Sequence, residues 1–287
     1  MTSEPLYKTP IEIFCHPCGS VDEDFELAMQ QQYCKYLHAT CCKPRKSEPE
    51  IKLGVCSLGA TVARKTAIQP VIICPQRFKE ETMFETIRKQ YLSKWHNVKW
   101  VQEVSIGVGG SVDYVAIEVD RNDKIKDFLC VEIQAAGTTG SPYPAVKEFL
   151  NHHRFLSKTY KYGINWANEF SKTMMQQAYK KGRIVEHWKR KIVFVMQDVA
   201  MDYLNASADC SKVTDFNPLA PIDFCLFKLK WSDNEWRLSY NAIKSTTIEG
   251  IRTILGGANV SDYPSEDEFI ENITKKGISD GILKIER

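Results

Sequence analysis

Three polar residues lie in two segments that otherwise have the pattern of buried strands. Asp113 falls in "VDYVAIEVD" (residues 112–120), and Glu132 and Gln134 fall in "FLCVEIQAA" (residues 128–136). Two carboxylates close together in an apolar sheet repel each other, so one of them takes up a proton or the pair binds a cation. Mg²⁺ is the usual cation, and it activates a bound water and polarises a phosphodiester. The residues therefore favour metal-dependent hydrolysis of a nucleic-acid backbone.

This pairing depends on the turn between the two segments. If the chain turns around Asn122 and Asp123, Asp113 faces Glu132 with Cβ atoms roughly 4.5 to 5.5 Å apart. Gln134 then lies on the same face as Glu132, because side chains alternate along a strand. A slip of one residue would place the two carboxylates on opposite faces, and polar residues near the ends of such a hairpin are common.

Cysteine is the second residue type that could do chemistry. The chain has ten, and seven precede residue 75: Cys15, Cys18, Cys34, Cys41, Cys42, Cys56 and Cys74. In a reducing cytoplasm they indicate metal binding, redox chemistry or burial. By spacing alone, Cys15 and Cys18 form the first pair to choose, and a redox protein built on them is an alternative that requires a low-pKa thiol. Cys130, Cys210 and Cys225 have apolar neighbours and are predicted to be core residues.

The surrounding pattern predicts an α/β (α+β) fold, in which helices flank a mixed central sheet. Residues 1–76, rich in cysteine, proline and charge, are predicted to form a small module, and residues 77–287 the main domain with a C-terminal hairpin and helix. Apolar spacing predicts a helix over 78–92 and another over 166–182 that stops at Gly182. A buried strand is predicted over 191–200, and a hairpin from 223–231 and 235–243.

Composition narrows the class of protein. No apolar run approaches the roughly 20 residues that cross a bilayer, and the N-terminus lacks the pattern of a signal peptide, so we expect a cytoplasmic protein without membrane partners. The net charge of +2 neither requires nor excludes nucleic acid. A basic run over residues 180–191 could contact phosphate or form a solvated helix end; it comprises Lys180, Lys181, Arg183, Lys189, Arg190 and Lys191.

An Asp followed, one strand and turn later, by Glu-x-Lys resembles the PD-(D/E)xK nuclease superfamily. Here Gln134 stands in the lysine position. Together with "GVCSLG", "IICPQRF", "SVDYVAIEV", "VEIQAAGTTGS" and "MMQQAYK", the pattern is similar to that of the NotI-type restriction endonucleases, which also carry glutamine there. The resemblance covers roughly residues 10–200.

The resemblance implies a restriction-endonuclease-like fold and a bacterial type II restriction endonuclease that cuts double-stranded DNA as a homodimer with Mg²⁺. Asp113 and Glu132 would hold the Mg²⁺, and Gln134 would orient the attacking water. Glutamine lacks the positive charge of lysine, so the metal would have to supply more of the electrostatic stabilisation. Glu81 or Glu85 could add a ligand, although both also fit a solvated helix face.

The resemblance further implies a structural iron or zinc ion held by four cysteines. Its ligands would be Cys34, Cys41, Cys56 and Cys74, with Cys42 as the alternative to Cys41 and with Cys15 and Cys18 in reserve. Four protein ligands leave no open position for a substrate, so such an ion would brace the fold. The competing function is a metal-braced, sequence-specific DNA-binding protein with an inactive nuclease site, which would bind DNA without cutting it.

Overall fold

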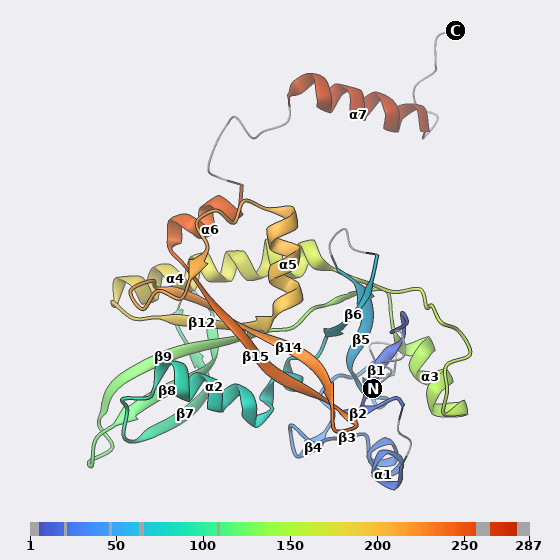
Figure 1. Ribbon diagram of the computed structural model, residues 1–287, viewed down its shortest axis with the longest axis horizontal. Helices are drawn as coiled ribbons and strands as arrows, with labels where there is room; N and C mark the ends of the chain where they lie inside the picture. The colour runs from blue at the N-terminus through green and yellow to red at the C-terminus, as the bar shows by residue number, and fades with distance from the viewer. Residues whose placement is uncertain are drawn as a thin grey trace. The chain divides into compact units, whose positions relative to one another are not determined.

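The computed structural model describes residues 6–19, 22–45, 48–62, 66–107, 110–256 and 265–279 (Figure 1). By its contacts the chain divides into two units, Met1–Leu255 and Gly256–Arg287. In the second unit, helix α7 (Glu266–Ser279) is the described element. The module boundary predicted at residue 76 lies within the first unit and stays a prediction.

A seven-stranded mixed sheet forms the centre of the first unit, as predicted. Its strand order is β13-β15-β14-β12-β9-β8-β7. Strand β12 runs parallel to both of its neighbours, β9 and β14, and the other pairs are antiparallel. The strands are β7 (Val98–Ser105), β8 (Ser111–Val119), β9 (Ile125–Gln134), β12 (Ile192–Gln197), β13 (Thr214–Asp215), β14 (Ile222–Ser232) and β15 (Glu235–Thr246).

Helices cover both faces of this sheet (Figure 1). On one face, helix α2 (Glu81–Tyr91) packs Met83 and Ile87 into an apolar cluster with Val131 of β9. On the other face, helix α4 (Met175–His187) packs Ala178 into a cluster that includes Cys130. The neighbours α5 (Asp198–Ser207) and α6 (Ile248–Ile254) contribute to this second cluster. Even-numbered residues of β9 therefore face α4, and odd-numbered residues face α2.

The second predicted helix is longer than expected. A π-helical segment, η3 (Ala167–Met174), continues directly into α4, and the stop predicted at Gly182 is wrong. Gly182 lies inside the helix, and the absence of a side chain there has a packing reason. A Cβ atom at this position would come within 2.5 Å of Cδ1 of Ile222. The glycine therefore lets α4 approach the sheet closely instead of ending the helix.

The other predicted elements are mostly confirmed. The helix over 78–92 corresponds to α2, which follows a 3₁₀ turn η1 (Pro75–Lys79). The late hairpin corresponds to β14 and β15, with Asp233 and Asn234 in the left-handed region at its turn. The strand predicted over 191–200 is too long, because β12 ends at Gln197 and α5 begins at Asp198. The exposed strand β7 escaped prediction.

The cysteine-rich N-terminal part contains a separate four-stranded antiparallel sheet of order β2-β1-β5-β6. Its strands are β1 (Pro10–Ile13), β2 (His16–Pro17), β5 (Val55–Thr61) and β6 (Ile68–Ile72). Around them lie helix α1 (Glu23–Gln31) and the short ladder of β3 (Tyr33–Cys34) and β4 (Ala39–Thr40). Helix α3 (Tyr143–His152) and the pair β10 (Thr138–Thr139) and β11 (Gly163–Ile164) complete the unit.

Candidate active site

The hairpin of β8 and β9 has the register that the sequence predicts. Tyr114 pairs with Val131 and Val115 with Cys130, so the next step along the ladder brings Asp113 opposite Glu132. At the other end, Asp123 takes the left-handed conformation expected of the turn, with φ of 59°. The carboxylate of Asp120 closes this turn by accepting hydrogen bonds from the backbone N–H groups of residues 122 and 124. Next to the turn Val119 pairs with Ile125, and the register shifts by one residue between Val119 and Glu118. The turn and this bulge together therefore determine which carboxylates meet.

Asp113 and Glu132 each commit one oxygen to a protein donor. Oδ2 of Asp113 accepts a hydrogen bond of 2.8 Å from the backbone N–H of Ile133. Oε1 of Glu132 accepts one of 2.5 Å from Nζ of Lys181 on α4. Because a carboxylate has a second oxygen with its own lone pairs, each residue retains the capacity to bind a cation as well. The arrangement fits a hard divalent ion held between two strands.

Electrostatics set Glu132 apart from an ordinary surface carboxylate. It is 5% exposed. Burial raises its pKa to about 7, and the carboxylate of Asp113 adds to this, whereas the hydrogen bond from Lys181 works against it. The charged form of Glu132 is therefore costly in this position, and a carboxyl whose pKa is raised by burial and by a neighbouring carboxylate is typical of a functional site.

Gln134 lies two residues beyond Glu132 at the end of β9, half-buried and opposite Met196 of β12. Strand alternation places its side chain on the face that also carries Glu132. Its Nε2 donates a 3.1 Å hydrogen bond to the carbonyl oxygen of Ala135. The three predicted residues thus lie near the same end of the β8–β9 ladder.

Lys181 also lies at this site, although its sequence position did not predict it there. It was grouped with the basic run over residues 180–191, but it is 3% exposed and ion-paired with Glu132. A signal was present, since Lys181 lies three residues after Ala178 and four before Val185, both fully buried on one helix face. Other members of the run also have protein partners: Arg190 pairs with Asp127 and Lys191 with Asp223.

The additional ligands considered on α2 lie elsewhere. Glu81 and Glu85 are both exposed, and α2 packs against the face of the sheet opposite to Lys181.

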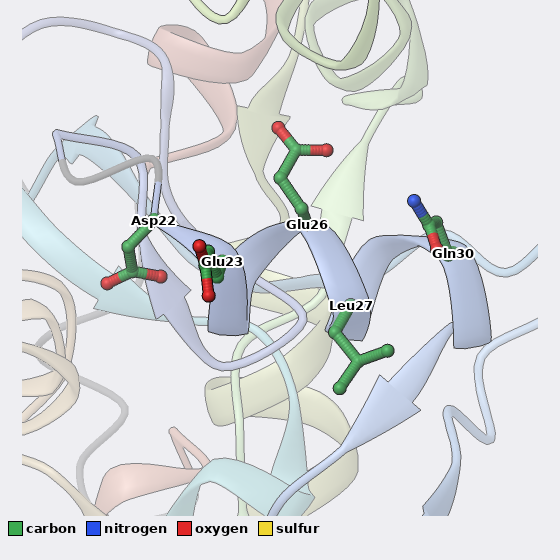
Figure 2. A pocket seen from close by; sticks show the side chains of 5 residues that line it. All are labelled: Asp22, Glu23, Glu26, Leu27 and Gln30. Atoms are coloured by element: carbon green, nitrogen blue, oxygen red, sulfur yellow. The ribbon is translucent and has the colours of Figure 1, made fainter.

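The open pocket on α1 shown in Figure 2 has walls from a single helix and its N-cap. Its side chains point to different sides of that helix, and three of the five are acidic: Asp22, Glu23, Glu26, Leu27 and Gln30. An acidic surface of this kind repels phosphate.

The N-terminal cysteines gather around one small cavity. Six of them line a space of about 10 Å³, room for a single ion or water: Cys15, Cys34, Cys41, Cys42, Cys56 and Cys74. The sulfur of Cys15 lies 3.6 Å from the sulfurs of both Cys34 and Cys56. Within the described ranges, no three Cys, His, Asp or Glu side chains are arranged as a formed metal site.

The thiols offer no support for redox chemistry. Burial raises the pKa of Cys18 well above its ordinary value and also raises that of Cys74. A reactive redox cysteine has the opposite shift, toward the thiolate. The core placement predicted for Cys130 and Cys225 is confirmed, whereas Cys210 is only half-buried.

Comparison with known proteins identifies the family. The family model of restriction endonuclease NotI matches residues 28–230, well over half of the chain. This chain belongs to the NotI restriction endonuclease family. The matched range contains Asp113, Glu132, Gln134 and Lys181 but not Cys15.

NotI family membership implies a restriction endonuclease, that is, a hydrolase that acts on DNA. No curated protein matches the chain significantly. Among the helices that the structure describes, none combines the length and the apolar character needed to cross a membrane.

Proposed function

We propose that this protein is a type II restriction endonuclease that hydrolyses double-stranded DNA at a specific site with Mg²⁺. The observation that supports this most strongly is the register of one hairpin, which brings Asp113 opposite Glu132 and leaves Gln134 near the same end. The family match and the position of the half-buried Asp113 beside the buried Glu132 both favour this chemistry.

Asp113 and Glu132 would hold the Mg²⁺, and each is already oriented by a donor, the N–H of Ile133 and Nζ of Lys181. When bound, Mg²⁺ supplies Lewis-acid polarisation of the scissile phosphate and lowers the pKa of a bound water. Gln134 would orient the attacking water through its side-chain amide, a group that both donates and accepts hydrogen bonds. The products would be a 5′-phosphate and a 3′-hydroxyl.

We further propose that the N-terminal cysteines hold a structural iron or zinc ion. Cys34, Cys41, Cys56 and Cys74 all line the one small cavity, and tetrahedral thiolate ligation is what either ion accepts. Cys15 lies at contact distance from two of the same sulfurs, so it competes for a place in the ligand set. The ion would stabilise a part of the chain that is built from short strands.

The natural partner is double-stranded DNA, and we expect two copies of the chain to act on it in the bacterial cytoplasm. A two-fold symmetric recognition site is cut on both strands most simply by a two-fold symmetric dimer.

The competing candidate is a DNA-binding protein with an inactive site. The family match favours the endonuclease over this candidate, because a restriction endonuclease cuts the DNA that it binds.

The test is to incubate the purified protein with long, sequence-diverse DNA in Mg²⁺ and to sequence the ends. Discrete fragments that share one end motif, absent in EDTA and with Asp113→Ala, would establish a site-specific endonuclease. DNA that stays intact but is retarded on a gel would instead favour the binding protein.

A further inference from the structure

A lysine reaches the active site from a place in the chain where the superfamily pattern does not put it. The pattern has lysine two residues after the glutamate, and here that residue is Gln134. Lys181, 49 residues after Glu132, extends from α4 and places Nζ 2.5 Å from Oε1 of Glu132. The site therefore has a cation, although the residue at the expected position is neutral.

Lys181 also connects the two strands that carry the carboxylates. Its Nζ donates a 2.7 Å hydrogen bond to the carbonyl oxygen of Ser111, two residues before Asp113 on β8. One ammonium group thus holds β8 through Ser111 and β9 through Glu132. The close packing of Gly182 against Ile222 keeps this part of α4 near the sheet. The position of Lys181 is consequently fixed by the core and not by a flexible surface helix.

We propose that Lys181 is a positioning residue of the nuclease, which fixes the carboxylate of Glu132 and brings to the active site the positive charge that Gln134 lacks. This inference rests on the endonuclease activity proposed above. A charged donor holds a carboxylate more rigidly than a neutral one, and preorganised charge at a water-excluded site is a large source of catalysis.

A merely structural role is the alternative, and the same chain offers a matched comparison. Lys191, which is half-buried, pairs with the buried Asp223 on β14, with Nζ 2.7 Å from Oδ2. Asp223 is fully buried and also accepts a hydrogen bond from Ser245. Removal of either lysine leaves a buried carboxylate unpaired, but only Lys181 faces the candidate active site. Removal of either lysine should lower the stability of the fold, whereas only the removal of Lys181 should slow cleavage.

The experiment compares Lys181→Met, Lys191→Met, Gln134→Lys and the double variant Gln134→Lys/Lys181→Met. Single-turnover cleavage is measured in Mg²⁺ on a duplex that carries the site found by sequencing the ends. The folded fraction of each variant, measured by circular dichroism, corrects the rates, and DNA affinity in EDTA provides a readout that does not depend on chemistry.

Lys181→Met is expected to cut at least about 100-fold more slowly while it binds DNA as tightly as the unaltered protein. Lys191→Met should cut at the unaltered rate per folded molecule. The double variant Gln134→Lys/Lys181→Met should cut at least about tenfold faster than Lys181→Met, because lysine at position 134 restores a positive charge at the superfamily position.

Three outcomes would overturn the role of Lys181: full activity in Lys181→Met, equal losses in the two Lys→Met variants, or a double variant no faster than Lys181→Met. If the unaltered protein itself leaves every DNA intact, the proposed endonuclease fails before the role of Lys181 is reached.

Discussion

Arg77 provides the strongest single test of how the cysteine-rich part is joined to the nuclease sheet. It follows Cys74 in the "CPQR" element and is fully buried. Its Nε donates to both carboxylate oxygens of Glu12 on β1, at 3.0 and 3.1 Å. Its other nitrogens donate to Glu80 and to the carbonyl oxygen of Trp236 on β15. One guanidinium thus holds both sheets and the start of α2.

The expected loss of unfolding free energy follows from the burial of Glu12. Arg77→Met keeps most of the side-chain volume but leaves Glu12, which is 1% exposed, without its cation. Loss of one partner of a buried ion pair costs about 3 to 5 kcal/mol of unfolding free energy. Lys99 and Asp123 form the matched surface pair, at 50% and 74% side-chain exposure. Lys99→Met should therefore cost at most about 1 kcal/mol.

Urea unfolding, followed by tryptophan fluorescence and by far-ultraviolet circular dichroism, measures both variants. Arg77→Met should shift the midpoint strongly with both probes together, because the residue joins the two sheets. A loss for Arg77→Met no larger than that for Lys99→Met would refute the reasoning, as would a transition of the cysteine-rich part that leaves the main sheet intact.

Two further predictions concern titration and metal. In metal-free protein the pKa of Glu132 is raised to about 7 from an ordinary 4.5. Between these two pKa values the native state binds more protons than the unfolded state. The free energy of unfolding therefore falls as the pH rises from the lower value to the higher. Glu132→Gln should flatten that fall in chemical denaturation in EDTA, and an unchanged slope would contradict the assignment. Elemental analysis of the purified protein is expected to find iron or zinc, which Cys56→Ser should lose and Cys210→Ser should keep. Equal metal content in the two variants would exclude Cys56 as a ligand.

The hairpin and its carboxylate pair could be predicted because their determinants are local. Alternation along each strand and a turn around Asp123 predict the register within about 20 residues of chain, and alternation places Gln134 on the face of Glu132. The bulge between Glu118 and Val119, which the observed register also requires, has no such signal. The late hairpin of β14 and β15 followed from the same two signals.

What escaped prediction depends on contacts between distant segments. Lys181 resembles a surface lysine until α4 is packed on the sheet, when its helical phase directs it to Glu132. Glycine typically indicates a helix stop, and the sequence does not reveal that Gly182 instead lies close to Ile222 of the sheet. Strand β7 has no buried residue, and Gln102 and Glu103 interrupt its apolar pattern. The spacing of the cysteines likewise could not reveal that Cys15 lies beside Cys34 and Cys56.

The central claim is that the carboxylate pair at the end of β8 and β9 cuts DNA. The most direct measurement is the single-turnover cleavage rate of Glu132→Gln in saturating Mg²⁺, beside Glu118→Gln, which alters a carboxylate near the far end of the same hairpin. Glutamine preserves the shape of the side chain and removes the charge that would bind the cation. Glu132→Gln is expected to lose at least about 1000-fold in rate with DNA binding intact, and Glu118→Gln is expected to retain its rate. Cleavage by Glu132→Gln at the rate of Glu118→Gln would contradict the central claim.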